Sequence, residues 1–151
     1  MNSVEMAPNH LDFFTMLIED SPLWKENELK DLALDAYLHG YSSLHGDWKV
    51  WIDKGIPIGI TFTVNKAPSN HKMWLGTILI AKEHRNKGYA RKILQALADK
   101  AVSRGDEAVF CGIPIEINEW SIFLGKCGFE QFKIEKDEYG RNYLVFVLPL
   151  K

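Results

Sequence analysis

The hydrophobic residues in the first forty positions recur with the period of a helix. From Leu11 to Ile18 they share one helical face, and Asn9, just before them, is a residue type that caps helix N-termini. Ser21-Pro22 interrupts this pattern. A second apolar stripe runs from Leu29 to Tyr37, and Gly40 stands where a glycine commonly ends a helix. We therefore expect two helices in this part of the chain.

The pattern then changes to the two-residue period of strands. Trp48, Val50 and Ile52 stand at every second position, and Asp53-Lys54-Gly55 is typical of a tight turn. The returning strand of this hairpin would cover 58–64. Met73 to Ala81 is almost continuously apolar, which is typical of a strand buried on both faces.

The last third of the chain alternates between helix and strand patterns. Apolar residues from Ala90 to Ala101 form a helical stripe that Gly105 ends, and a short apolar strand follows over 108–113. This order of elements predicts a mixed α/β or α+β domain around one central sheet. The remaining elements are a short helix that Asn118 would cap and Gly128-Phe129 would end, and a hairpin of strands 129–134 and 143–148 that turns at 138–140.

Composition places the chain among ordinary globular domains. It has 151 residues, of which 46% are hydrophobic and 25% charged, unlike a disordered chain. Eighteen Lys and Arg against twenty Asp and Glu give a net charge of −2, so the chain has no overall attraction to nucleic acid or anionic membranes. Its apolar runs are far shorter than the ~18 residues of a membrane span, and its first residues lack the features of a secretory leader.

The cysteines and histidines predict neither disulfides nor a metal site. Cys111 and Cys127 are too few for a disulfide framework, and the five histidines are scattered without a metal-ligand spacing. We therefore expect a cytoplasmic protein with reduced thiols, no metal and no membrane partner.

One segment combines the features of an anion site. Trp74 to Ala90 consists of an apolar strand, a polar loop and a helix start, with Gly88 at the turn into the helix. A helix N-terminus carries N–H groups without helical partners and the positive end of the dipole, and glycine lets an anion approach the backbone. A phosphate site is therefore predicted, although on these features alone a solvated basic helix start is the alternative. The cations of this segment are Lys82, Arg85, Lys87, Arg91 and Lys92.

The same residues resemble a family signature. Arg85-Asn86-Lys87-Gly88-Tyr89-Ala90 is similar to the R/Q-x-x-G-x-G/A motif of the GCN5-related N-acetyltransferase (GNAT) family, and it lies between a strand and a long helix as that motif does. NEWSIFLGKCGF at 118–129 resembles the family's short helix that ends in Gly-Phe, and VWIDKGIPIG at 50–59 resembles its strand pair. The resemblance covers about residues 47–148.

The resemblance implies a single acetyltransferase-like domain over 1–151. Its fold would be a mixed, largely antiparallel, splayed central sheet flanked by helices. The N-terminal helices would cover 9–40, the cofactor-binding strand, loop and helix 73–105, and the C-terminal helix and hairpin 118–148.

The resemblance also implies coenzyme A or acetyl-CoA as co-substrate, without a metal. Backbone N–H groups of the signature loop would hold the pyrophosphate, and the end of the preceding strand would pair with the pantetheine arm. Asn118 would bind that arm from the opposite side, and the Ile80 N–H would polarise the thioester carbonyl. The implied cofactor residues are Ile78, Leu79, Ile80, Arg85, Asn86, Lys87, Gly88, Tyr89, Ala90, Arg91 and Asn118.

Two positions depart from the family pattern. Leu124 stands where the family often has a tyrosine that protonates the leaving thiolate, and Trp74 stands near the place of a frequent general-base glutamate. Water can protonate a thiolate, and a carboxylate can deprotonate the amine through water. Glu116, after the strand 108–113, is our candidate for that base; a solvated loop carboxylate is the alternative interpretation.

The predicted function is transfer of the acetyl group of acetyl-CoA to an amine of a small molecule or peptide, by direct attack in a ternary complex. The alternative is a non-catalytic CoA-binding sensor domain, which the missing acid and base favour. Nucleic-acid binding through 82–92 is the weakest hypothesis, because the rest of the chain is acidic and the segment lacks interleaved aromatic residues. The sequence leaves open a monomer or a homodimer and does not identify the acceptor.

Overall fold

A computed structural model describes residues 1–150. They form two compact units: the first comprises Met1–Val64 and Thr77–Ala90, and the second comprises Asn65–Gly76 and the chain from Arg91 onward. The seven strands follow the order β1-β2-β3-β4-β5-β7-β6 in one sheet. This mixed α/β class, with a largely antiparallel sheet, confirms the predicted fold class.

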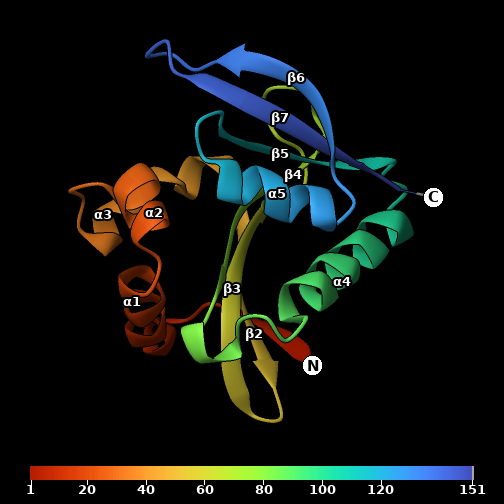
Figure 1. The fold of residues 1–151 in the computed structure, drawn as a ribbon. Helices are drawn as coiled ribbons and strands as arrows, with labels where there is room; N and C mark the ends of the chain where they lie inside the picture. Colours follow the sequence, from red (N-terminus) through yellow and green to blue (C-terminus); the bar gives the residue numbers. More distant parts are fainter. Residues whose placement is uncertain (151) are drawn as a thin grey trace. The chain divides into compact units, whose positions relative to one another are not determined.

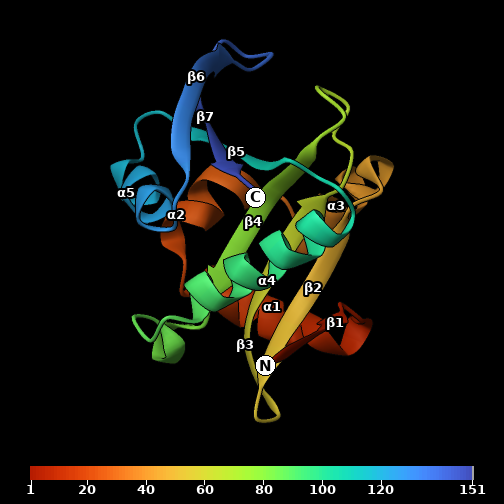
Figure 2. The ribbon, with the colours of Figure 1, turned by 90° about the vertical axis from the view of Figure 1, so that its right-hand side faces the viewer.

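The first unit contains an antiparallel sheet of β1 (Asn2–Glu5), β2 (Asp47–Asp53) and β3 (Ile56–Val64). Figure 2 shows β1 beside β2. The predicted turn between β2 and β3 is confirmed: Lys54 and Gly55 both have positive φ, 52° and 77°, as in the two-residue turns that match strand twist. From Ile58 to Val64 every residue of β3 is buried.

Short helices cover one face of this sheet (Figure 1). Their aromatic side chains pack on those of β2 and β3, with ring centroids 4.5 to 6.5 Å apart, and form an aromatic cluster. Its members are Phe14, Trp24, Tyr37, Tyr41, Trp48 and Phe62. The helical elements are η1 (Pro8–His10), α1 (Leu11–Glu19), α2 (Pro22–Trp24), the π-type turn η2 (Lys25–Leu29), α3 (Leu34–Gly40) and η3 (Ser42–Leu44).

Strand β4 (Met73–Ile80) and helix α4 (Tyr89–Ser103) each have residues in both units. In the second unit β4 runs parallel to β5 (Ala108–Pro114), with Met73 opposite Val109 and Trp74 opposite Phe110. The predicted apolar stripe of α4 is buried, and Gly105, with a φ of +87°, follows the end of the helix as expected. The buried residues of α4 are Ile93, Leu94, Leu97, Ala98 and Ala101.

The second unit ends with helix α5 (Asn118–Lys126) and the strands β6 (Glu130–Lys136) and β7 (Asn142–Pro149), which pair antiparallel. Gly128 has a φ of +95°, its N–H donates to Gly125 O, and the Phe129 N–H donates to Leu124 O. These two bonds form a Schellman motif, and Leu124 and Phe129 are both buried beside it. The predicted glycine ending of this helix is confirmed.

Several sequence-based expectations for the N-terminal part were wrong. Asn9 lies within η1, and α1 begins after His10 with no side-chain cap. The expected helix from 29 to 40 is only α3, because Lys30 adopts φ 58° and Leu32 is exposed rather than packed. Gly40 is the last helical residue of α3 and does not adopt positive φ. Strand β1 was not predicted, because four mostly polar residues carry little pattern.

Two later expectations also need correction. Asn118 is the first residue of α5 and not its cap; Ile117 precedes it, without a side-chain hydrogen bond to the helix. Strand β4 is buried on one face, not on both: Met73, Leu75, Thr77 and Leu79 are buried, and the alternate residues are half-buried or exposed. Within residues 1–150, no helix has the length and apolar character needed to cross a membrane.

Candidate functional site

The first unit contains the end of β4, the loop that follows it and the start of α4. The Ala81 N–H donates to Ile58 O at 2.8 Å, which fixes the end of β4 against β3. A Cβ on Gly59 would lie 2.3 Å from Leu79 O, so only glycine allows β3 to approach β4 this closely. Ile78 and Ile80 are half-buried on the more open face of β4. The sheet therefore holds the backbone of the predicted pantetheine strand in a defined place.

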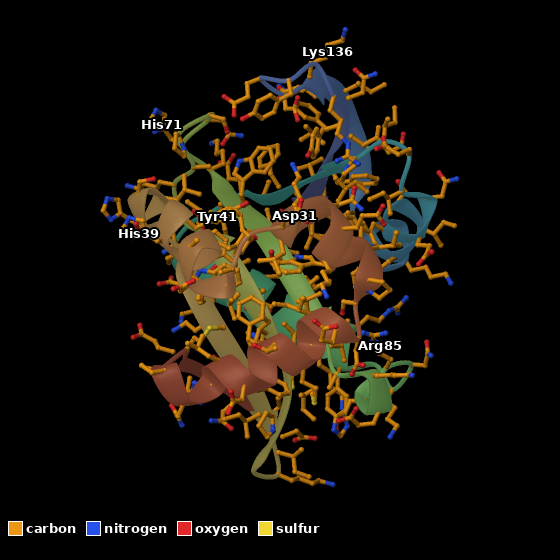
Figure 3. The ribbon with its side chains drawn as sticks, turned by 90° about the vertical axis from the view of Figure 1, so that its left-hand side faces the viewer. Asp31, His39, Tyr41, His71, Arg85 and Lys136 are labelled. Atoms are coloured by element: carbon orange, nitrogen blue, oxygen red, sulfur yellow. The ribbon has the colours of Figure 1, made fainter. Side chains whose placement is uncertain are left out.

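Arg85 connects the loop to the N-terminal helices. After β4 the chain makes the turn η4 (Lys82–His84). The Arg85 Nε donates to Ile80 O at 3.0 Å, and its Nη2 donates to Asp20 O at 2.9 Å and to Ser21 Oγ at 3.1 Å. Figure 3 shows Arg85 at η4, beside the end of α1. Its guanidinium is occupied by protein acceptors, so Arg85 positions the loop, and its charge adds to the positive potential there.

The loop reaches α4 through two residues in the left-handed region. Asn86 has a φ of 61° and Gly88 a φ of 83°, and nothing lies within 4 Å of the position that a Gly88 Cβ would occupy. Asparagine and glycine are the residue types that tolerate this conformation best. The first four N–H groups of an α-helix have no partner within the helix, and a fifteen-residue helix such as α4 carries the positive end of its dipole there. An open backbone at the start of a long helix, preceded by exposed Lys82 and Lys87, is the type of geometry that suits an anion such as phosphate.

Tyr89 fixes the first residue of α4 to the hairpin of β2 and β3. Its hydroxyl donates to Asp53 Oδ2 at 2.7 Å, and its ring meets His84 edge-on at 5.9 Å between centroids. The hydrogen bond from Tyr89 lowers the pKa of the Asp53 carboxyl, and the same bond raises the pKa of the Tyr89 hydroxyl. The signature tyrosine thus has a structural role that the sequence did not indicate.

The second unit contains the other predicted site residues. Glu116 follows β5 and is exposed, and it accepts a hydrogen bond from Arg141 Nε at 2.9 Å as part of an ion pair. This hydrogen bond lowers the pKa of Glu116 below its usual range. Asn118, two residues later, is exposed in the first turn of α5. Arg91, in the first turn of α4, donates from Nη2 to Lys126 O at 2.6 Å and so connects α4 to the end of α5.

The residues at the two departures from the family pattern have structural roles. Leu124 is only 3% exposed and packs at the Schellman ending of α5. Trp74 stacks on Phe110 and donates from Nε1 to Asn70 Oδ1 at 2.9 Å. Burial raises the pKa of the Cys127 thiol, which favours the neutral thiol over the thiolate. Among residues 1–150, no cluster of three His, Cys, Asp or Glu side chains could hold a metal ion.

The first unit also has a pocket of about 360 Å³ between the β1–α1 connection, the end of α3 and β2. Three rings of the aromatic cluster form its wall, and none of its lining residues belongs to β4 or to the loop after it. Its lining includes Met6, Leu11, Leu38, Tyr41, Trp48 and Phe62.

Comparisons with known proteins agree on one family and fold. The sequence model of the acetyltransferase (GNAT) family matches residues 11–129. An uncharacterized protein of Bacillus subtilis (strain 168), YkzC, is 42% identical over 134 residues, which cover 89% of this chain and 94% of that protein.

Solved acetyltransferases share the fold at low sequence identity. An acetyltransferase from Thermus thermophilus superposes with a TM-score of 0.76 at 18% identity, over 99% of this chain and 96% of that one. A chimera of the Vibrio cholerae spermidine N-acetyltransferase SpeG and hSSAT gives 0.75 at 16% identity, over 98% and 94%. A ribosomal-protein-alanine N-acetyltransferase from Brucella melitensis gives 0.69 at 19% identity, over 99% and 100%.

The bond between Tyr89 and Asp53 predicts a pH-dependent stability difference between the wild type and Tyr89→Phe. Because this bond depresses the folded-state pKa of Asp53, its stabilisation is present above the unfolded pKa of about 3.9 and is lost as pH falls through the folded value. In urea unfolding between about pH 2 and 7, the deficit of the variant should be largest near neutrality and should shrink in acid. Tyr139→Phe, at a side chain 84% exposed, is the matched control and should show no such trend. A Tyr89→Phe deficit that is constant across this range would contradict the assignment.

Proposed function

Because the chain belongs to the acetyltransferase (GNAT) family, we propose that it transfers the acetyl group of acetyl-CoA to an amine of a small molecule or peptide by direct attack in a ternary complex. The observation that carries the proposal is the start of α4, where left-handed Asn86 and Gly88 leave an open backbone beside basic side chains. The family match runs through both compact units, and we propose that they act together as one acetyltransferase domain.

The start of α4 would hold the pyrophosphate of the co-substrate. The N–H groups from Asn86 to Arg91 are the proposed donors, and the absence of a Cβ at Gly88 leaves room for phosphate oxygens against the backbone. Lys82 and Lys87 are exposed and add Coulomb attraction. Bonds from N–H groups to a charged phosphate contribute about 1.5–3 kcal/mol each, so several of them support binding without any metal.

The backbone of β4 would pair with the pantetheine arm as an added strand does. Ile78, Leu79 and Ile80 are the proposed partners, and the close packing at Gly59 keeps this strand in place. In this arrangement the Ile80 N–H donates to the thioester carbonyl oxygen and stabilises the negative charge that develops there. Asn118 as a further partner of the arm stays a prediction.

In the proposed reaction, a base that deprotonates the acceptor amine would matter more than an acid that protonates the leaving thiolate. The Leu124 side chain cannot donate a proton, so water would protonate the leaving thiolate. An alkylammonium with a pKa near ~10 must lose a proton before it attacks, so activity should rise with pH across the neutral range. Glu116 is the proposed acceptor of that proton, through water. Its ion pair with Arg141 keeps it ionised but, by lowering its pKa, limits its strength as a base.

The alternative function is a CoA-binding sensor without activity. It is favoured by the apolar residues Leu124 and Trp74, which are fixed in the packing rather than available for proton transfer. An enzyme and a sensor both bind coenzyme A, and only the enzyme releases the thiol in the presence of an acceptor.

Amine-dependent thiol release separates the two functions. We expect the protein to release the free thiol of coenzyme A from acetyl-CoA in the presence of at least one amine. The panel contains amino acids, polyamines, aminoglycosides and peptide N-termini, and the rate of release should increase as the pH rises. The thiol is measured with a chromogenic disulfide, and reactions without protein or without amine give the background. Coenzyme A binding without any amine-dependent release would support the sensor instead.

The proposed cradle can be tested with a matched pair of glycines. Gly88 and Gly105 flank α4 with φ of +83° and +87°, and a Cβ at either would meet nothing within 4 Å. Alanine should therefore destabilise both variants alike, by about 1–2 kcal/mol. Only Gly88→Ala should weaken coenzyme A, by about tenfold or more, because its methyl group displaces a phosphate oxygen from a backbone donor. Equal affinities of the two variants in calorimetric titration would exclude Gly88 from the cradle.

The role of Glu116 is tested by Glu116→Gln. If its carboxylate accepts the amine proton through water, kcat/KM should fall by about tenfold or more, or roughly 1.4 kcal/mol of transition-state stabilisation. Glu119→Gln, at an exposed carboxylate in the first turn of α5, is the control and should keep the wild-type rate. A Glu116→Gln enzyme with the wild-type rate and pH profile would leave only the free-amine fraction as the source of the nucleophile.

A further inference from the structure

Three aromatic side chains of the second unit form an aromatic row: Trp74 on β4, Phe110 on β5 and Phe132 on β6. The rings of Trp74 and Phe110 are stacked, with centroids 5.5 Å apart and 24° between their planes. Phe132 meets Phe110 edge-on, with 6.0 Å between the centroids. Trp74 and Phe110 are half-buried and Phe132 is 57% exposed, so each ring keeps part of its surface open to solvent.

Two exposed glycines lie beside the aromatic row. Trp74 lies opposite Phe110 where β4 and β5 pair, and side chains two positions apart along a strand point to the same face. The next residues on that face are therefore Gly76 and Gly112, and both are exposed although β4 and β5 are inner strands of the sheet. Met73, which points the other way, is buried. The two glycines thus form a flat floor that the aromatic row borders.

Trp74 is held in place by a hydrogen bond and by a contact with β5. Its Nε1 donates to Asn70 Oδ1 at 2.9 Å, and the same oxygen accepts from the Lys72 N–H at 3.0 Å. A Cβ on Gly112 would lie 3.4 Å from Trp74 Cζ3, so the edge of the indole lies over this glycine. A ring that is fixed in this way loses little conformational freedom when a ligand stacks on it, which favours binding.

The exposed end of the aromatic row already has a cation of the protein beside it. Lys133 Nζ lies 5.5 Å from the centroid of the Phe132 ring, within the range of a cation–π contact. A flat ring of a ligand can stack on Trp74 and Phe110, whereas a second ammonium group of the same ligand would meet a like charge at Phe132. The row therefore favours a ligand with one amine and an aromatic body over a polyamine.

We propose that the aromatic row and the glycine floor bind the acceptor, and that the acceptor is a monoamine with a flat aromatic ring. The ring stacks on Trp74 and Phe110, over the floor at Gly112. This inference rests on the proposed acetyl transfer, because it places the acceptor on the strand whose Ile80 N–H is the proposed donor to the thioester carbonyl. Gly76 precedes Ile80 by four positions on β4.

A matched pair of amines tests the preference for a flat ring. Phenethylamine and cyclohexylethylamine carry a primary amine on the same two-carbon chain, and only the first has an aromatic ring. In calorimetric titrations of the full chain with coenzyme A present, phenethylamine should bind about fivefold or more tightly than cyclohexylethylamine or spermidine. Equal or weaker binding of the aromatic amine would overturn the proposal.

Substitutions in the row and the floor locate the bound ring. Trp74→Leu should abolish the preference for phenethylamine, and Trp74→Phe should keep most of it, because phenylalanine retains a flat ring. Gly112→Ala places a methyl group in the floor at an ordinary contact distance from the indole, so the fold should persist while phenethylamine binds about fivefold or more weakly. Neither Trp74→Leu nor Gly112→Ala should change the affinity for coenzyme A.

A glycine outside the row is the control for Gly112→Ala. A Cβ on Gly125, in α5, would meet nothing within 4 Å, so Gly125→Ala should keep the wild-type affinity for phenethylamine. Wild-type affinity and preference in both Gly112→Ala and Trp74→Leu would show that the ring binds elsewhere and would overturn the proposal.

Thiol release from acetyl-CoA separates a wrong acceptor class from a wrong function. Phenethylamine should give a higher kcat/KM than cyclohexylethylamine or spermidine, and Gly112→Ala should raise its KM rather than lower kcat. Release with spermidine or cyclohexylethylamine but not with phenethylamine would overturn the acceptor class and leave the proposed transfer standing. Binding of phenethylamine without release from any amine would support the ring site and contradict the acetyl transfer.

Discussion

The start of α4 is the feature on which the proposed activity depends. A helix leaves its first N–H groups without partners inside the helix, and they must find water, side chains or a ligand. Here the chain enters α4 through Gly88 at a φ of 83°, which carries no side chain to fill the space in front of these groups. Lys87, next to Gly88 in the chain, is exposed and carries a positive charge. We propose that this local backbone forms an anion site, which would precede any catalytic group in importance.

Long-range contacts hold this start in place. Arg85 connects the loop to Asp20 and Ser21, across 65 and 64 positions of sequence. Tyr89 connects the first residue of α4 to Asp53, 36 positions away. With the close approach of β3 at Gly59, these bonds fix both ends of the loop in the first unit. A preorganised loop loses less conformational entropy when a ligand binds, so these structural contacts support the proposed binding.

The features that could be predicted from the sequence are those set by local chemistry. The Lys54-Gly55 turn, the buried stripe of α4 and the Gly128-Phe129 ending of α5 each follow from a few adjacent residues, and the structure confirms them. The N-terminal helices were placed less well, because Leu32 fits a helical stripe in sequence yet is 54% exposed. The contacts of Arg85 with Asp20 and Ser21, and of Glu116 with Arg141, carry no local signal, since tertiary folding brings these residues together. The ion pair between Arg141 and Glu116 lowers the pKa of Glu116 and makes its carboxylate a weaker base than the sequence alone suggests.

Hydrogen exchange of the backbone amides, with and without coenzyme A, tests the central claim most directly. It measures each N–H group of the proposed cradle in the intact protein, without substitution. We expect saturating coenzyme A to slow exchange over 86–91 and at 78–80, while amides of the exposed strand β6 exchange as before. Unchanged exchange over 86–91 at saturation, or protection confined to other segments, would contradict the proposed cradle.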